Sequence, residues 1–304
     1  MAMDEKITLQ IQSVLYENEI DALLRALDAL HNALRVHSRG AVPLIDDVIV
    51  HYGDASSKPL IDDALLNSLN SKYDDLLTVE YSFFGENTGT AKGHNRLAGS
   101  CRSTHIMVMN PDVIVCPTFF DAILSPFERG DVGIVEARQT PIEHPKSYDA
   151  ETGETSWAST AAVVFPTAVY EEVGGFDEST FFMYCDDVDF SWMVRLSGKK
   201  VVYQPRAVVF HAKRLSHEAG WVPTFAEVYY SAEAALLMSY KWSNDERLQK
   251  LIKEYSSSCV EACEKAVEEF RRREAQGELP ERLDEDHRIA TFIDDGYAVH
   301  KFNM

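Results

Sequence analysis

Asp186, Asp187 and Asp189 place three carboxylates within four residues, in a segment (174–211) that also holds a double glycine, an aromatic run and a closing histidine. Carboxylates this close repel one another unless a metal, a cation or a substrate proton compensates their charge. If residues 184–196 form a helix, Asp186 and Asp189 share one face and Asp187 points elsewhere. A carboxylate among the aromatic neighbours of this segment has a raised proton affinity, which suits a general base acting on a hydroxyl. The alternative is a helix N-terminus enriched in acids, which explains one or two of the three.

A second candidate cluster is Asn110-Pro111-Asp112, which follows the apolar run 105–109. A hard divalent cation that bridges phosphates uses such a carboxylate together with one or two protein oxygens and water. The alternative is a turn aspartate that accepts backbone N–H bonds. His211 follows another apolar run and precedes Lys213 and Arg214. It is either a structural histidine or a nitrogen ligand to the metal of Asp112, in which case the two cations can neutralise a leaving diphosphate.

The loop Glu86–Asn95, ENTGTAKGHN, is punctuated by glycines and precedes an expected helix. It has neither the G-x-x-x-x-G-K-[ST] order of a P-loop nor the G-x-G-x-x-G order of a dinucleotide fingerprint. Its backbone N–H groups can still cradle phosphates or a ribose. Further along the chain, Arg138 lies in a polar, irregular stretch and is a candidate anion contact.

The elements that must position these side chains alternate between strand and helix. Apolar or alternating runs predict strands, and residues 20–34 carry leucines at helical spacing. The predicted strands are 7–11, 47–52, 76–81 and 105–110, followed after residue 131 by the runs VGIVEA, AAVVF, KVVYQP and AVVFH. This alternation predicts a mostly parallel α/β sheet, whose ligands gather beyond the carboxyl ends of the strands. The polar clusters 16–19, 51–57 and 110–112 follow strand ends and would share that edge.

From about residue 216 the composition becomes helical. Residues 225–242 and 245–273 have helical periodicity. We interpret their apolar stripe as packing rather than as a partner site; it consists of Leu248, Ile252, Tyr255, Cys259 and Phe270. The last thirty residues are charged with scattered aromatics, and we expect a tail folded back onto the body.

Composition argues against several classes of function. A net charge of −20 over 304 residues argues against nucleic-acid binding and against adsorption to an anionic membrane. Five cysteines, an odd number without framework spacing, indicate reduced thiols. No secretion signal or apolar span is evident, so we expect a cytoplasmic protein with at most peripheral contact at the inner face of the membrane.

Five segments, in the order of the chain, resemble the family 2 glycosyltransferases, which are inverting enzymes with the GT-A fold. They are SVLYENE, DVIVHYGDASS, ENTGTAKGHN, MNPDVIVCP and the segment 174–211, and the similarity covers about residues 7–240. EARQTPIEHPK is also similar to bacterial polysaccharide transferases that include rhamnosyltransferase-like members. The resemblance implies an α/β GT-A fold, with a Rossmann-like, mostly parallel central sheet flanked by helices. It divides the chain into a catalytic domain at 1–215, with a nucleotide-binding half at about 1–115 and an acceptor half at about 116–215, and a helical C-terminal extension at 216–304.

The resemblance also implies roles for individual residues. Asp187 would be the catalytic base, and Asp112 would bind a divalent metal, Mn²⁺ or Mg²⁺, with His211 as a further ligand. Nucleotide-sugar binding would fall to Tyr16, Glu17, Tyr52, Asp54, Asn87, Lys92, Asn95, Asn110, Lys213 and Arg214. Acceptor binding would fall to Arg138, Trp157, Gly174, Gly175 and Asp186.

The implied activity is metal-dependent, inverting transfer of a hexose or deoxyhexose from a nucleotide-diphosphate sugar to a hydroxyl of a saccharide or lipid-linked saccharide, in surface-polysaccharide synthesis. Three positions depart from the family pattern: His51, where a strand-end aspartate is usual, Asn110 in the metal motif, and Met193, where an arginine is frequent. They leave open a catalytically weakened sugar-nucleotide-binding module, and a sugar nucleotidyltransferase is the other alternative. No nucleic-acid partner is expected, and the C-terminal helices offer surface for a homodimer.

Overall fold

The structure is a computed structural model that describes residues 6–40, 44–211 and 223–302. At its centre the described residues form an eight-stranded sheet with the strand order β3-β2-β1-β4-β7-β6-β8-β5. The strands are β1 (Ile7–Leu15), β2 (Ile45–Asp54), β3 (Thr78–Phe83), β4 (His105–Met109), β5 (Val113–Val115), β6 (Val132–Thr140), β7 (Ala162–Pro166) and β8 (Lys200–His211). The runs KVVYQP and AVVFH, predicted as separate strands, join into the single strand β8, whose pairing with β6 contains a register shift.

The strand directions decide which residues share an edge of the sheet. β1 is parallel to β2 and β4, β2 is parallel to β3, and β6 is parallel to β8. β7 is antiparallel to both β4 and β6, so β6 runs in the direction of β4. The carboxyl ends of β1, β2, β4, β6 and β8 therefore lie at one edge. This confirms the predicted α/β sheet, and ligand binding at that edge stays a prediction.

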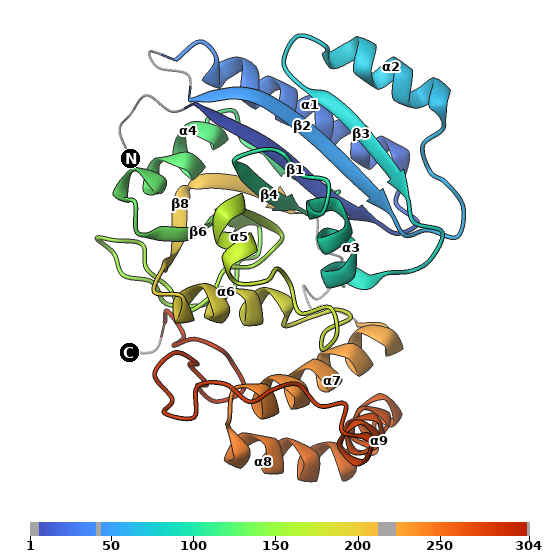
Figure 1. Cartoon of the computed structure of the whole chain (residues 1–304), viewed down its shortest axis with the longest axis vertical. Coiled ribbons are helices and arrows are strands. Elements are labelled where there is room, and N and C mark those ends of the chain that lie inside the picture. The colour runs from blue at the N-terminus through green and yellow to red at the C-terminus, as the bar shows by residue number, and fades with distance from the viewer. Residues whose placement is uncertain (1–5, 41–43, 212–222, 303–304) are drawn as a thin grey trace.

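Helices cover both faces of the sheet (Figure 1). They are α1 (Ile20–His37), α2 (Asp63–Tyr73), α3 (Gly89–Ala98), α4 (Phe119–Leu124), α5 (Thr167–Glu172) and α6 (Asp186–Leu196). The buried leucines of α1, spaced three and four residues apart, pack in one core with Leu9 and Val50 of the sheet. On the other face, Phe165 of β7 and Phe190 of α6 belong to a second core, which includes residues of α3 and α5.

The C-terminal helices lie below α6 in Figure 1. They are α7 (Phe225–Lys241), α8 (Asp245–Ser256) and α9 (Glu261–Gln276). The helical stretch predicted at 245–273 is therefore two helices, because the chain turns at Cys259, where φ is 55°. Cys259 is exposed in that turn and does not extend the apolar stripe. Trp192 of α6 meets Trp242 at 5.2 Å between ring centroids, edge to face, in a core that α7, α8 and α9 share.

The tail after α9 folds back onto the sheet domain, as the sequence predicted. Ser147 N donates to Val299 O at 2.7 Å, and Ser156 Oγ donates to Tyr297 O at 2.7 Å. These bonds place the last described residues beside the segment that follows β6. The expected domain boundary at residues 215 and 216 lies outside the described residues.

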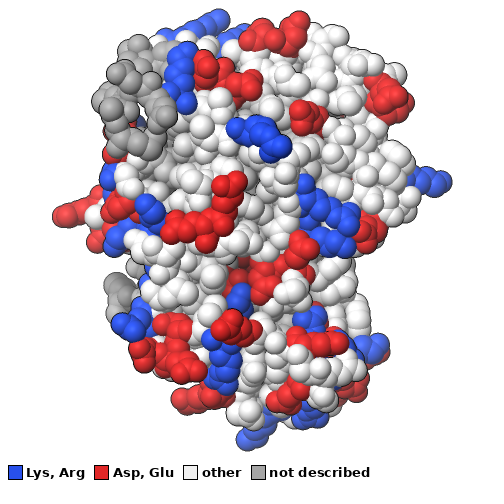
Figure 2. Space-filling view, viewed as in Figure 1, with Lys and Arg blue, Asp and Glu red and all other residues white. Residues whose placement is uncertain are grey.

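Charged side chains of both signs alternate over the C-terminal helices on the face shown in Figure 2. On α9, Lys265 pairs with Glu261 at 2.8 Å one helical turn away. Such exposed pairs contribute little to stability. In the described part of the chain, no helix has the length and apolar character that crossing a membrane requires.

Candidate functional site

The first turn of α6 holds the three clustered carboxylates. The helix begins at Asp186, two residues later than predicted, because Tyr184 and Cys185 have left-handed backbone angles with φ of 67° and 57°. Non-glycine residues in this region are strained, and the strain persists only where surrounding contacts hold it. One such contact joins Cys185 Sγ to Tyr297 Oη of the C-terminal tail at 3.3 Å.

Two of the three carboxylates are buried and tie α6 to other helices. Lys241 Nζ donates to Asp189 Oδ2 at 2.9 Å, and Trp242 Nε1 donates to Asp189 Oδ1 at 2.9 Å. Thr90 Oγ1 donates to Asp186 Oδ2 at 2.7 Å. Asp189 therefore anchors α6 to α7, and Asp186 anchors it to α3. The buried side chain of Asp186 serves this contact, and its acceptor-binding role stays a prediction.

Asp187 instead lines a pocket of about 520 Å³. Its neighbours there include Trp157, Tyr184, Arg247 and Tyr297. The pocket therefore combines Asp187 and two further carboxylates, Glu254 and Asp295, with aromatic walls, one of which comes from the C-terminal tail. Backbone Val188 N donates to Asp187 Oδ1 at 2.8 Å and fixes the direction of the carboxylate.

The electrostatics around Asp187 favour a carboxyl that takes up a proton near neutral pH. The pKa of Asp187 is raised to about 7, mainly by burial and in part by the nearby Asp186, while Lys146 opposes the rise. Lys146 Nζ itself lies 2.5 Å from Glu136 Oε2, and both side chains are buried. Lys146 Nζ also donates to Trp157 O at 2.7 Å. Trp157, predicted to bind the acceptor, thus lines the pocket and is held by the same lysine.

The predicted metal residues meet at the carboxyl-end edge of the sheet. His211 Nε2 lies 3.6 Å from Asp112 Oδ1 and 3.4 Å from Asn110 Nδ2. His211 Nδ1 lies 3.0 Å from Gln139 Oε1, an acceptor, so Nδ1 carries the proton and Nε2 presents its lone pair. A carboxylate oxygen and an imidazole nitrogen at this separation can contact one divalent cation. Across the described residues no group of three or more His, Cys, Asp and Glu side chains converges on a metal position.

A short segment connects this edge with the Asp187 pocket. Trp157 lines the pocket, Ala158 N donates to Ser191 Oγ of α6 at 2.9 Å, and Ala161 O accepts from Asn110 N at 3.0 Å. Trp157 and Ala161 are four residues apart, so their Cα atoms lie at most about 15 Å apart. The structure therefore brings the candidate base and the candidate metal ligands into one region.

Two side chains predicted to hold the nucleoside are buried instead. Tyr52 is 1% exposed and packs in the core with α1, because it follows Val48 and Val50 on the core face of β2. It is not available to stack on a base, and this prediction is corrected. Asp54 accepts bonds from Ser56 N at 2.9 Å and Leu60 N at 2.8 Å, so it shapes the loop after β2.

Tyr16 and Glu17 remain at the surface just beyond the end of β1. Tyr16 is 54% exposed, and Glu17 has a left-handed φ of 53°. Glu17 N donates to Ser56 Oγ at 2.7 Å, so the ends of β1 and β2 are joined here. These two residues are placed where a ligand at the sheet edge can reach them.

The loop before α3 uses most of its polar groups internally. Asn87 Oδ1 accepts from Gly89 N at 3.1 Å, and Lys92 Nζ lies 3.3 Å from Glu86 Oε1. Asn95 Oδ1 accepts from Phe176 N and from a tyrosine hydroxyl, while its Nδ2 donates to Phe176 O and to a glutamate. All four hydrogen-bonding positions of Asn95 are therefore occupied within the chain, and the nucleotide-sugar role of Asn95 stays a prediction.

The double glycine belongs to the same contact. Gly174 and Gly175 have φ of 83° and 76°, which side-chain-bearing residues rarely adopt. A Cβ on Gly175 would lie 2.8 Å from Tyr170 Oη and 3.0 Å from Asn95 Oδ1. The turn therefore packs on α3 and α5, and neither glycine lines the Asp187 pocket.

The remaining predicted residues lie apart or outside the description. Arg138 is exposed at the end of β6, with Nε 3.7 Å from Glu143 Oε2. Lys213 and Arg214 lie outside the described residues.

Several residues of the site were not found from the sequence. Glu136, Gln139 and Lys146 lie in EARQTPIEHPK but had no assigned role, whereas Arg247 and Tyr297 lie in no motif. Each gains its place through a contact that only the folded chain makes. For the buried pair of Glu136 and Lys146, the signal in the sequence was a lysine that lies close to a strand glutamate. That signal is weak, because many exposed pairs share it.

The described backbone is similar to solved glycosyltransferase structures. One is GalNAc-T7 with UDP, GalNAc and Mn²⁺, with a TM-score of 0.63 and 12% identity, over 93% of this chain and 57% of that chain. Another is the mannosyltransferase PcManGT from Pyrobaculum calidifontis in complex with GDP-Man and Mn²⁺, with a TM-score of 0.53 and 13% identity, over 94% of this chain and 79% of that chain. The fold is therefore the GT-A glycosyltransferase fold, as the sequence predicted.

This chain spans 57% of the length of GalNAc-T7. No model of a known protein family matches the sequence, and no curated protein matches it.

Proposed function

We propose that the chain is a metal-dependent, inverting glycosyltransferase with Asp187 as its general base. The observation that carries the proposal is the position of Asp187 in the 520 Å³ pocket, with a pKa raised to about 7 by burial. A base of this pKa is half ionised near neutral pH, where it is also basic enough to accept a proton from a hydroxyl. The GT-A fold supports the same class of reaction.

In the proposed reaction, the donor is a nucleotide-diphosphate sugar and the acceptor is a hydroxyl of a saccharide or lipid-linked saccharide. The acceptor oxygen attacks the anomeric carbon from the face opposite the diphosphate, and the bond from that carbon to the diphosphate breaks. The hydroxyl proton moves to a carboxylate oxygen of Asp187. Proton transfer of this kind contributes roughly a hundred- to ten-thousand-fold in rate.

The chain's own residues support this step in three ways. Val188 N holds one carboxylate oxygen of Asp187, and Ser191 Oγ donates to the Asp187 carbonyl at 2.7 Å. The positive charge of Lys146 limits the rise in the pKa of Asp187, so that part of the carboxyl is ionised at neutral pH. The aromatic walls of the pocket suit the apolar faces of a sugar ring.

The residues at the sheet edge fit a divalent cation such as Mn²⁺ or Mg²⁺. Asp112 and His211 supply an oxygen and a nitrogen 3.6 Å apart, and Gln139 fixes the imidazole with Nε2 facing Asp112. With two protein ligands, the remaining positions of the ion are left for phosphate oxygens and water. A cation bound there stabilises the charge that develops on the leaving diphosphate. Mn²⁺ accompanies the nucleotide or nucleotide sugar in both similar structures.

We further propose a hexose or deoxyhexose as the transferred sugar, surface polysaccharide as the product and the cytoplasmic side of the membrane as the place of action. The likeness of EARQTPIEHPK to rhamnosyltransferase-like members supports the choice of deoxyhexose. Tyr16, Glu17, Asn110, Lys92 and the loop of Asn87 are proposed to contact the donor, because they remain near the ligand edge.

Thermal unfolding with a panel of UDP-, GDP- and dTDP-sugars, each with Mn²⁺ or with EDTA, tests the proposal. A donor that binds the folded state should raise the unfolding temperature as its concentration rises, and only with the metal. The stabilising donor is then incubated with saccharide acceptors and the products are analysed. Binding without transfer to any acceptor would favour a binding module. Release of pyrophosphate from a nucleoside triphosphate and a sugar phosphate would favour a nucleotidyltransferase.

A further inference from the structure

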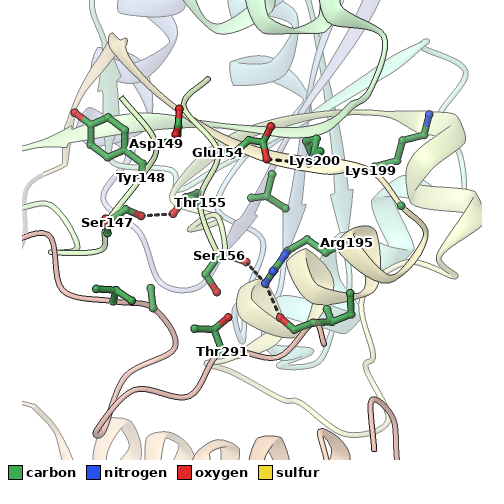
Figure 3. A pocket seen from close by; sticks show the side chains of 15 residues that line it. Ser147, Tyr148, Asp149, Glu154, Thr155, Ser156, Arg195, Lys199, Lys200 and Thr291 are labelled. Atoms are coloured by element: carbon green, nitrogen blue, oxygen red, sulfur yellow. Dashed lines mark hydrogen bonds and ion pairs between the residues drawn. The ribbon is translucent and has the colours of Figure 1, made fainter. Parts of the chain in front are cut away.

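A second cavity, of about 680 Å³, lies beside the Asp187 pocket and has no part in the proposed transfer. Its walls are the segment 147–156, the end of α6, the start of β8 and the tail (Figure 3). The bond from Ser156 Oγ to Tyr297 O stands between the two cavities, since Tyr297 lines the first and Ala298 lines the second. The volume is within the range of small-molecule sites.

The central feature of this cavity is Arg195. Figure 3 shows its side chain extending from α6 into the space between Ser156 and the tail. Arg195 Nη1 donates to Ile289 O at 2.6 Å and lies 3.5 Å from Ser156 O. Within the described residues, no carboxylate forms an ion pair with Arg195, and its other guanidinium nitrogens make no hydrogen bond. Arg195 thus offers unused donors to the cavity.

The carboxylates that line the cavity are already compensated. Asp149 Oδ1 accepts from the backbone of Glu151 at 3.0 Å and of Thr152 at 2.7 Å. Glu154 pairs with Lys200 at 2.9 Å and with Arg129 at 3.1 Å. Although the net charge of the chain is −20, the carboxylates that line this cavity are all engaged elsewhere and do not pair with Arg195.

The guanidinium is also partly removed from water. Burial lowers the pKa of Arg195, and the charge of Asp284 opposes that change in part. A cation that has lost part of its hydration gains most from an anion that also satisfies its N–H donors. The planar fork of arginine matches a carboxylate through two parallel bonds.

Neutral polar groups surround this cation. Among the described residues, the hydroxyls of Ser147 and Thr291 have no hydrogen-bond partner, and both line the cavity. The ring of Tyr148 is 37% exposed at the rim. Free hydroxyls beside an aromatic ring suit a polyhydroxylated ligand rather than a bare inorganic ion.

We propose that this cavity binds an acidic sugar unit, whose carboxylate pairs with Arg195 and whose hydroxyls meet Ser147 and Thr291. Asp187 and Arg195 are eight residues apart on α6, which places their Cα atoms about 12 Å apart along the helix axis. A saccharide chain that enters the Asp187 pocket could therefore carry the acidic unit. That last point rests on the proposed function, whereas the site itself does not.

Isothermal titration of the full chain with D-glucuronate, D-glucose and inorganic phosphate, without any donor, tests the site. We expect glucuronate to bind at least about tenfold more tightly than glucose, because glucose lacks the charged pair. Phosphate should bind more weakly than glucuronate, because it cannot reach the hydroxyls. Equal binding of glucose, or tighter binding of phosphate, would overturn the proposal. Since no donor is present, the outcome does not depend on sugar transfer.

Four variants locate the bound sugar. Arg195→Gln removes the charge, and Thr291→Trp fills the cavity while it leaves the arginine in place. Both should weaken glucuronate binding at least about tenfold. Lys265→Gln is the matched control, because Lys265 lies on α9 and does not line the cavity, and Asp187→Asn changes only the other pocket.

The two control variants, the lysine substitution and Asp187→Asn, should leave glucuronate binding unchanged. Retained binding in Thr291→Trp, or lost binding in Asp187→Asn, contradicts the proposal. The filled-cavity variant decides the question if Arg195→Gln does not fold, and circular dichroism establishes which variants are folded.

Discussion

Lys146 Nζ lies 2.5 Å from Glu136 Oε2 in the interior of the protein, and the charges of both residues act on Asp187. The lysine lowers the pKa of Asp187 and the glutamate raises it, but burial is the largest influence. The ion pair therefore adjusts the pKa of the candidate base, although neither of its two side chains lines the Asp187 pocket.

Replacement of the candidate base should abolish turnover but not donor binding. We expect Asp187→Asn to reduce kcat by roughly a hundred- to ten-thousand-fold, because the amide cannot accept the hydroxyl proton. Donor affinity, measured by thermal shift with Mn²⁺, should change little. Glu172→Gln, an exposed carboxylate on α5, is the matched control and should retain full activity. Unchanged turnover in Asp187→Asn would rule out the assignment.

Activity should depend on the ionisation of Asp187. Since the pKa is about 7 and the base works only when ionised, kcat/KM should rise with pH and level off above that value. The charge of Asp186 raises the pKa of Asp187, so Asp186→Asn should move this rise to lower pH. A pH–rate profile of both proteins checks the direction, and a shift to higher pH contradicts it.

The same carboxyl should cost stability at alkaline pH. The pKa of Asp187 is raised from 3.8 in an ordinary setting to about 7 in the folded chain, so the folded state binds more protons between these values. Stability from this group is therefore present below pH 4 and is lost as pH rises through 7. Asp187→Asn should raise the free energy of unfolding by about 4 kcal/mol at pH 8. It should have little effect at pH 4, and urea unfolding at both pH values measures the difference.

The metal response should depend on two residues from different strands. Asp112→Ala and His211→Ala should each abolish the Mn²⁺-dependent part of donor stabilisation, since each removes one protein ligand. Gln139→Leu should weaken Mn²⁺ binding about 10- to 100-fold, because Nδ1 of His211 loses its acceptor. Asp47→Ala serves as the control, because Asp47 lies near the start of β2, at the opposite edge of the sheet. Full activity in EDTA would exclude the metal role.

The link between α6 and α7 should carry much of the stability of the C-terminal helices. Lys241 Nζ lies between Asp189 Oδ2 at 2.9 Å and Asp177 Oδ2 at 2.8 Å, and Asp189 is 1% exposed. Lys241→Met leaves these charges unpaired and should destabilise the protein by about 3–5 kcal/mol. Lys265→Met breaks an exposed pair and should have a much smaller effect on stability. Guanidinium unfolding compares the two, and equal effects would contradict the buried network.

Much of the fold could be read from periodicity. Alternating residues around Leu9 and leucines at helical spacing from Leu23 to Leu30 specify which face of each element is buried. The break at Cys259 was missed, because helical composition continues across it and no glycine or proline marks the turn. The direction of Tyr52 was in principle visible, since it continues the alternation of Val48 and Val50.

The sequence by itself determined the sheet, the edge at which strand-end residues gather, and the crowding of Asp186, Asp187 and Asp189. These follow from local periodicity and from the direction of parallel strands. Only the tertiary structure decided which carboxylate is left for chemistry. Thr90 and Lys241 come from distant helices and engage Asp186 and Asp189, while Asp187 is left facing a pocket. A carboxyl's proton affinity depends on its burial and on the charges packed around it, and those contacts exist only when the chain is folded.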